Sequence, residues 1–370
     1  MRQHTLRKSA ILTWGRSRVR ALQARRGLAR GRRIRCERSG MVHLEPFELL
    51  RPGAGEILVQ VELSAVSPGT ERAQYNRLPG VTIDPPFTPG YSGVGRVVEA
   101  GKGCAFVPGD RVAGPFHHQS LETVAEAKCF LVPSGVAPER AALVGLGIIA
   151  LHGVRRARIA WGERVLVLGR GILGRLAAAL ADLNGAGAVA LAGRTDPVAD
   201  GAFDVVLDVT GNPEALGRAA RAAAPGGRLV LLGSPRGGAP PFETETPGPL
   251  RILGVHATQA GRSLQGVQTD DAASEGSLFL EWLALGRLVI DGLEPETIDP
   301  QECWSFYRRL GAGRPAVGVA LFDWTRLPGP MRGGRSTLRF PDALGSLDPE
   351  QQARRLRAGT PHRSSGWDRS

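Results

Sequence analysis

The chain of 370 residues is poor in cysteine and in long apolar segments, and both shortages exclude classes of protein. Its four cysteines are scattered without a Cys-x-x-Cys pair, which argues against a disulfide framework and a structural zinc lobe. The longest apolar stretch, Ala141 to Val154, has 14 residues and includes His152, so it is too short to span a bilayer. The N-terminus lacks the apolar segment of a secretory signal peptide. These shortages predict a soluble, cytoplasmic protein with no membrane partner.

Positive charge is scarce in the body of the chain and concentrated at its ends. The formal net charge is +12, but residues 1–40 alone carry +12 and residues 326–370 carry +5, whereas residues 41–325 carry −5. A nucleic-acid-binding fold would carry its basic surface on the folded body. The arginines of residues 1–40 are not interleaved with aromatic side chains, since Trp14 is the only one there. The sequence therefore argues against a nucleic-acid partner.

Both ends lack a periodic apolar pattern, so we predict that residues 1–40 are a disordered basic extension and residues 326–370 a disordered tail. Residues 1–40 resemble a transit peptide in composition, and the alternatives are a disordered extension or translated sequence ahead of a true start at Met41. Such segments cannot offset the entropy cost of ordering by burial. We expect residues 41–325 alone to fold with an unchanged melting temperature.

Residues 41–155 show the alternation and turn signals of short β-strands. From Glu56 to Leu63, apolar and polar residues alternate as in a half-buried strand. Residues 67–71, Ser-Pro-Gly-Thr-Glu, indicate a turn that leads into a proline-rich loop. Glycine-containing β-like segments follow at residues 89–101 and 108–112. Short strands at this spacing predict a small barrel-like β-domain.

Residues 156–289 change to alternating strand-like and helix-like segments. Residues 164–168 form a continuous apolar run, which is typical of a strand buried on both faces. Further strand-like runs and two helical segments follow, and alternation of this kind predicts a doubly wound parallel sheet. The fold class predicted for the whole chain is therefore α/β, with a β-rich domain followed by this sheet.

A Gly-x-Gly-x-x-Gly motif, Gly169 to Gly174, lies between the apolar strand and the next helix. In that context Gly169 permits a tight turn, Gly171 lets the backbone approach a pyrophosphate, and Gly174 lets the helix pack close to the strand. The phosphates would meet free N–H groups at the start of the helix. The motif predicts a dinucleotide-binding site.

The choice between NAD and NADP is made at the end of the next strand, where an acidic residue would bind the ribose hydroxyls of NAD. This sequence has Arg194 there instead, which favours the 2′-phosphate of NADP, while Asp196 keeps NAD open as the alternative. The predicted cofactor-binding residues are Gly169, Gly171, Ile172, Leu173, Gly174, Arg194, Thr210 and Gly211.

The segment between Gly174 and the strand that starts near Asp204 is short. It has room for one helix and one strand, whereas a full mononucleotide-binding half contains another helix and strand. We therefore predict that the sheet lacks about one strand and that the adenine side of the pocket is abbreviated.

Several motifs in order carry a family resemblance. They are Pro-Gly-Tyr-Ser-Gly-Val-Gly at 89–95, Pro-Gly-Asp-Arg-Val at 108–112, the glycine motif, and Pro-Gly-Gly-Arg-Leu-Val-Leu-Leu-Gly at 225–233. Over residues 45–324 the chain resembles the medium-chain dehydrogenase/reductase superfamily. The resemblance implies a GroES-like catalytic domain at 41–155, joined by residues 290–325, and a Rossmann domain at 156–289. The nearest branch looks like the bacteriochlorophyllide dehydrogenases and their relatives.

The sequence departs from the zinc-dependent members of this superfamily at all three ligand positions. Pro68 stands where they have the ligating cysteine, Tyr91 where they have the histidine, and Gly145 near the third ligand. A catalytic zinc needs three protein ligands, so we expect no zinc. The adjacent His117 and His118 are expected to be loop residues.

Without zinc, another group must stabilise the charge that develops on the substrate oxygen. Tyr91, Glu71 and Thr70 occupy positions that would face the cleft, with Tyr91 as oxyanion donor and Glu71 as proton relay; packing and a salt bridge are the respective alternatives. The sequence predicts a zinc-independent NAD(P)-dependent oxidoreductase acting on a small-molecule alcohol, ketone or enone, with homo-oligomerisation left open. The alternatives are an enoyl or quinone reductase and a non-catalytic nucleotide-binding relative.

Overall fold

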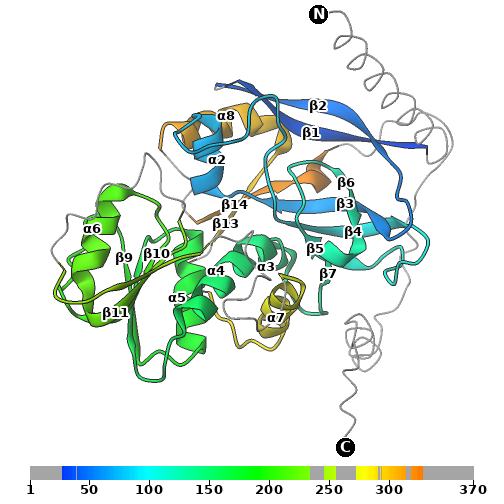
Figure 1. The fold of residues 1–370 in the computed structure, drawn as a ribbon. Coiled ribbons are helices and arrows are strands. Elements are labelled where there is room, and N and C mark those ends of the chain that lie inside the picture. The colour runs from blue at the N-terminus through cyan, green and yellow to red at the C-terminus, as the bar shows by residue number, and fades with distance from the viewer. Residues whose placement is uncertain are drawn as a thin grey trace, which may run out of the picture.

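The computed structural model describes residues 27–38, 40–233, 246–255, 272–290, 292, 294–313 and 318–327, and these build two lobes (Figure 1). One lobe, here called the mixed-sheet lobe, contains a seven-stranded sheet and the two-stranded hairpin of β1 (Leu28–Arg38) and β2 (Met41–Leu50) (Figure 1). The other, the parallel-sheet lobe, contains a five-stranded sheet. The predicted α/β class, with a β-rich domain and a parallel sheet, is confirmed.

The mixed-sheet lobe combines segments from both ends of the described chain. Its strand order is β13-β14-β3-β4-β5-β7, with β6 paired to β3. The strands are β3 (Glu56–Ala65), β4 (Gly93–Ala100), β5 (Arg111–Gly114), β6 (Leu121–Ala125), β7 (Phe130–Leu131), β13 (Pro295–Ile298) and β14 (Val319–Asp323). The late strand β14 pairs antiparallel with β3, so residues near 320 and residues near 60 lie side by side in one sheet.

Residues 67–71 form the start of a helix rather than the predicted turn. The helix α2 (Pro68–Tyr75) begins after Ser67, with proline at its first position. Proline is favoured there because its fixed φ suits the helix and its missing N–H would have no helical acceptor. The turn signal of Ser-Pro-Gly was therefore a helix start, and α8 (Cys303–Gly311) packs against α2 (Figure 1).

The prediction that residues 1–40 are disordered is wrong for β1 (Leu28–Arg38). This strand pairs antiparallel with β2 (Met41–Leu50). Its Ile34 is fully buried and Cys36 is 2% exposed, and both belong to the core that also holds Phe322. The strand is ordered because these apolar side chains alternate with arginines that remain at the surface. Residues 1–26 and 328–370 lie outside the described residues.

The five parallel strands have the order β12-β11-β10-β8-β9. They are β8 (Arg164–Leu168), β9 (Ala188–Ala192), β10 (Phe203–Asp208), β11 (Ala223–Leu231) and β12 (Arg251–Gly254). A full Rossmann sheet has a third strand outside its second. No strand lies between β9 and β10, a stretch that is described throughout, so the predicted loss of one strand is confirmed.

Helices cover both faces of the parallel sheet. Side chains of β8 alternate, so that Val165 and Val167 pack with α5 (Ile172–Leu183), whereas Leu166 and Leu168 pack with α6 (Pro213–Ala222). The two lobes share one apolar core, which runs through α3 (Pro138–Ala141), α4 (Val144–Ala157) and α7 (Ala272–Ala284) (Figure 1). In the part of the chain that the structure describes, every helix is too short or too polar to cross a bilayer.

Candidate active site

The glycine motif forms a seat for phosphates at the start of α5. Gly169 has a φ of +118°, a conformation that side-chain-bearing residues rarely adopt. A Cβ on Gly174 would lie 1.7 Å from the carbonyl oxygen of Gly169, so only glycine allows the helix to approach this closely. A Cβ on Gly171 would instead meet no protein atom within 4 Å. This open space beside the first N–H groups of α5 fits a pyrophosphate.

Two other predicted cofactor residues, Thr210 and Gly211, lie beside this seat. A Cβ on Gly169 would be 3.1 Å from Cγ2 of Thr210, so the loop after β10 adjoins the glycine motif. Thr210 donates from both its backbone N–H and its hydroxyl to Oδ1 of Asp208. Burial raises the pKa of Asp208, although the hydrogen bonds from Thr210 oppose the shift. Ile172 is buried and Leu173 half-buried, so both anchor the helix start.

The loop after β9 presents Arg194 to solvent. Among the described residues, no ion pair involves its guanidinium. Asp196, the alternative determinant, is engaged within the loop: its Oδ2 accepts the Gly193 N–H at 2.7 Å and lies 2.7 Å from Nη2 of Arg170.

Tyr91 lies between the other two positions at which the resemblance would place zinc ligands, Pro68 and Gly145. A Cβ on Gly145 would lie 3.0 Å from the carbonyl oxygen of Tyr91. The Tyr91 hydroxyl reaches the residue before Pro68, donating to Ser67 Oγ at 2.8 Å. Proline, tyrosine and glycine offer none of the sulfur, imidazole or carboxylate ligands that zinc takes in proteins, so this donor set does not fit zinc.

A cluster of potential metal ligands does occur on the β1–β2 hairpin. Within the described ranges, Glu37, His43 and Glu45 bring three such atoms together. However, Arg33 lies 2.7 Å from Glu45, and Arg35 lies within 4 Å of both glutamates. These arginines account for the carboxylates without an ion.

Three hydroxyl groups gather where the ligands would be. Tyr91 donates to Ser67 Oγ at 2.8 Å, and Ser67 Oγ donates to Thr70 Oγ1 at 3.3 Å. Burial raises the pKa of Tyr91 to about 12, and hydrogen bonds with Ser67 and Thr70 only partly oppose this shift. Tyr91 is therefore a neutral hydrogen-bond donor at ordinary pH. The structure thus brings together two of the three predicted catalytic residues, Tyr91 and Thr70.

The prediction that Glu71 faces the cleft is wrong. Its side chain is 1% exposed and turned into the mixed-sheet lobe. Oε1 accepts the backbone N–H of Ser67 at 2.7 Å, and Oε2 accepts the hydroxyl of Tyr307 at 2.6 Å. Nε2 of His118 lies 3.1 Å from the same Oε2. The carboxylate points inward because these buried donors lie on the interior side of α2.

His118 is the site residue that sequence reasoning missed. It is fully buried, whereas the neighbouring His117 is exposed and contacts Glu122. Trp324 donates from Nε1 to Ser64 Oγ, so the serine hydroxyl can donate to Nδ1 of His118, 2.8 Å away. That arrangement leaves a proton on Nε2 for Glu71. The only available signal was the adjacency of two histidines, which does not say which one is buried.

The buried polar cluster consists of five side chains from separate segments. Its members are Ser64, Glu71, His118, Tyr307 and Trp324. Burial raises the pKa of Tyr307 well above its ordinary value, and the charge of Glu71 adds to the shift. Tyr307 therefore remains a donor, and the cluster fixes the start of α2, where Ser67 and Thr70 lie.

Comparison with known proteins agrees with this geometry. The alcohol dehydrogenase GroES-like domain family matches residues 53–167. The 2-desacetyl-2-hydroxyethyl bacteriochlorophyllide A dehydrogenase of Cereibacter sphaeroides is 30% identical over 224 residues, which cover 51% of this chain and 70% of that protein.

Solved structures share the fold at lower identity. A protein from Sinorhizobium meliloti 1021 described as a zinc-binding dehydrogenase, bound to NADP, has a TM-score of 0.62 and 21% identity, covering 80% of this chain and 99% of its own. L-Idonate 5-dehydrogenase from Escherichia coli K-12 has a TM-score of 0.65 and 16% identity over 80% and 99%. The chain belongs to the alcohol dehydrogenase-like, medium-chain dehydrogenase/reductase superfamily, and it is an oxidoreductase.

Proposed function

We propose that this protein is a zinc-independent, NADP-preferring oxidoreductase that interconverts a secondary alcohol and a ketone. The observation that carries the proposal is the replacement of the ligand set by hydroxyl groups. Tyr91, Ser67 and Thr70 are linked by hydrogen bonds of 2.8 and 3.3 Å, and they lie at or beside the positions of the first two expected zinc ligands, Pro68 and Tyr91. A small-molecule alcohol or ketone is the expected substrate, in line with the hydroxyethyl group in the name of the bacteriochlorophyllide relative.

The parallel-sheet lobe would hold NADP(H) with residues that fit its parts. The space at Gly171 accepts the pyrophosphate, and the loop with Thr210 adjoins it. Arg194, exposed after β9, suits a 2′-phosphate. When bound, NADPH supplies the hydride. Structural relatives bound to NADP and to NADH support a nicotinamide cofactor.

Tyr91 would stabilise the negative charge that develops on the substrate oxygen. A phenol with a pKa of about 12 stays protonated at neutral pH and still can give its proton to a more basic alkoxide. When Tyr91 donates to the substrate oxygen, Ser67 would turn to donate to Tyr91 and Thr70 would turn to donate to Ser67, so the order of these hydrogen bonds reverses. The protons balance because Thr70, which is half-buried, takes one proton from solvent for each proton that Tyr91 gives to the substrate.

Glu71 is assigned to positioning rather than to proton transfer. Its carboxylate holds the backbone N–H of Ser67, which fixes the hydroxyl that Tyr91 contacts. The four cysteines are unpaired, as in proteins of a reducing compartment, and we include a cytoplasmic location in the proposal.

The test is turnover by Tyr91→Phe. We expect NADPH fluorescence to fall when the wild-type protein meets ketones in a panel of ketones, enones and quinones. Loss of one oxyanion donor should lower kcat by about 100- to 1,000-fold and leave NADPH affinity unchanged. Tyr75→Phe, at the end of α2 and outside the hydroxyl chain, is the matched control and should retain activity.

Three outcomes would contradict parts of this proposal. Turnover of enones alone would assign double-bond reduction, and tight NADPH binding without any turnover would favour a non-catalytic relative. About one zinc per chain in elemental analysis, with activity lost on chelation, would contradict zinc independence.

A further inference from the structure

Arg170, the middle residue of Gly169-Arg170-Gly171, reaches across to the end of β9. Its side chain is 57% exposed, and Nη2 lies 2.7 Å from Oδ2 of Asp196. A Cβ on Gly193 would lie 3.4 Å from its Cδ, so the aliphatic part lies over the loop after β9. One residue thus joins the pyrophosphate seat to the loop that meets the adenosine ribose.

Asp196 is the carboxylate that could accept hydrogen bonds from the ribose hydroxyls of NAD if it had no other partners. Its Oδ2 already accepts the backbone N–H of Gly193 at 2.7 Å, and the same oxygen carries the contact with Arg170. The negative charge of Asp196 is therefore balanced by Arg170, and its side chain is turned back onto its own loop. Without Arg170, its charge would face an incoming 2′-phosphate and repel it.

Arg218 of α6 holds this loop in place. Its Nη1 donates to the carbonyl oxygens of Gly193 at 2.7 Å and Arg194 at 3.0 Å, and its Nη2 donates to that of Asp196. In a full Rossmann sheet, another strand and helix follow β9. Here the guanidinium of Arg218 ties the loop to α6, so that Arg194 and Asp196 keep fixed places although that strand is missing.

We propose that Arg170 is a second determinant of NADP specificity: it neutralises Asp196 and, together with Arg194, binds the 2′-phosphate. This inference rests on the proposed use of NADP. A guanidinium has five N–H donors in a fork, so Nη2 can stay on Asp196 and Nε on the carbonyl oxygen of Leu191, 3.5 Å away, while Nη1 meets the phosphate. The 2′-phosphate, with two negative charges, then meets Arg170 and Arg194, while the charge of Asp196 is balanced by Arg170.

The experiment measures the dissociation constants of NADPH and NADH for the full chain by fluorescence titration. Arg170→Ala should weaken NADPH binding by roughly 10- to 100-fold, as for a charge-assisted pair, and leave NADH unchanged or tighter, because Asp196 is released. Arg170→Lys keeps the charge and should retain part of the preference. Equal weakening of both cofactors would place Arg170 on the shared pyrophosphate and overturn the inference, as would no change.

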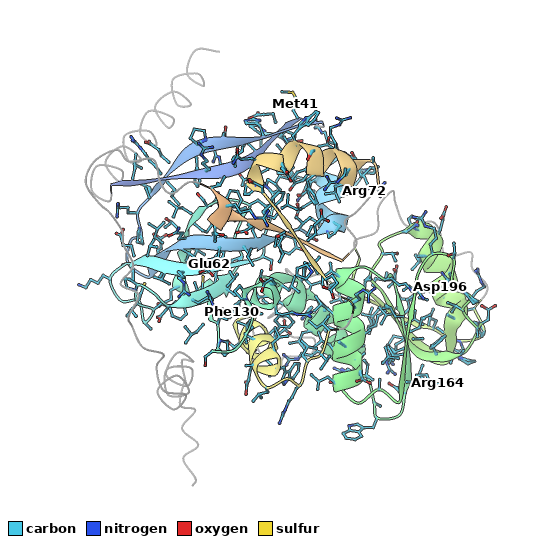
Figure 2. The ribbon with its side chains drawn as sticks, turned by 180° about the vertical axis from the view of Figure 1, so that it is seen from behind. Met41, Glu62, Arg72, Phe130, Arg164 and Asp196 are labelled. Atoms are coloured by element: carbon cyan, nitrogen blue, oxygen red, sulfur yellow. The ribbon has the colours of Figure 1, made fainter. Side chains whose placement is uncertain are left out.

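Two further variants keep the result interpretable. Arg164→Ala removes an exposed arginine that pairs with Asp204 at 3.6 Å, at the opposite end of the parallel sheet, and should change neither constant (Figure 2). Asp196→Asn should shift the preference further towards NADPH, even if Arg170→Ala folds poorly, and an unchanged ratio would count against the inference. The wild-type ratio alone tests the proposed cofactor: preference for NADH would reject NADP use, whereas the change on substitution tests Arg170.

Discussion

The pyrophosphate seat and the buried polar cluster are built in opposite ways. The seat is formed by six consecutive residues, Gly169 to Gly174, and works through missing side chains and backbone N–H groups. The buried polar cluster joins β3, α2, the loop before β6, α8 and the helical turn after β14, and works through side chains that are almost fully buried. One therefore depends on local geometry, and the other depends on the assembled fold.

This difference separates two kinds of sensitivity. In the seat, an added methyl group matters because of the space it occupies. In the buried polar cluster, a removed group matters because its partners remain buried without hydrogen bonds, which costs more than the bond itself contributed. Substitutions in the pyrophosphate seat and in the buried polar cluster test whether the two regions differ in this way.

Gly174→Ala should have the largest effect. The new Cβ would lie 1.7 Å from the Gly169 oxygen, so α5 or the glycine loop must move. We expect NADPH affinity to fall by about 1,000-fold or more, equivalent to about 4 kcal/mol, together with a lower melting temperature. Fluorescence titration and thermal melting measure the two quantities.

Gly171→Ala is the matched control for the seat. Its Cβ would meet no protein atom within 4 Å, and its φ of −71° suits any residue. The protein should keep its melting temperature and still lose cofactor affinity, since the methyl group enters the space assigned to the pyrophosphate. Unchanged affinity would remove the phosphates from this space.

Glu71→Ala should have the next largest effect, on stability. It leaves the donors of Ser67, Tyr307 and His118 without their acceptor in the interior. Removing one member of a buried charged network costs about 3–5 kcal/mol, which denaturant unfolding would measure.

An exposed pair, His117 and Glu122, is the control for the buried pair of His118 and Glu71. His117 and Glu122 are also 3.1 Å apart, but His117 is 47% exposed. His117→Ala should therefore cost only about 0–1 kcal/mol, the usual range for an exposed ion pair. Equal costs for the two pairs would mean that burial does not set their energetics.

Sequence reasoning located the seat because its signal is local. The apolar strand, three glycines and following helix are contiguous, and the missing strand followed from the short spacing before β10. The buried polar cluster was not predictable, because Glu71 and Tyr307 lie 236 positions apart. The local motif at residues 67–71 predicts a cleft position for Glu71, because its hydrogen-bond partners His118 and Tyr307 lie far away in the sequence.

The strand β1 was missed for a different reason. Arg33, Ile34, Arg35 and Cys36 alternate as in a half-buried strand, but the arginine content of residues 1–40 outweighed this short pattern. The arginine content describes residues 1–40 as a whole, whereas within them Leu28–Arg38 forms a strand that folds against the protein. The expected stability of residues 41–325 alone must therefore be revised.

Removing β1 should have a smaller effect than Glu71→Ala, and it links the strand to the buried polar cluster. The N–H of Ile34 donates to the carbonyl oxygen of His118 at 2.9 Å, and Cys36 packs in the same core as Tyr307. A chain beginning at Met41 therefore loses both the backbone support of His118 and the fully buried side chain of Ile34.

Burying one isoleucine side chain contributes roughly 1.5–3 kcal/mol, so we expect the Met41 chain to lose about 2–3 kcal/mol. For a protein of more than 250 residues, that loss corresponds to a melting temperature lower by roughly 3–6 °C. A chain beginning at Gly27 keeps β1 and is the control for the rest of the extension. If the Met41 chain melts with the Gly27 chain, β1 adds nothing to the fold, and the alternation at residues 33–36 carries no stabilising contact. If only the Met41 chain is destabilised, and Glu71→Ala costs it less than it costs the Gly27 chain, then β1 and the buried polar cluster support each other through His118.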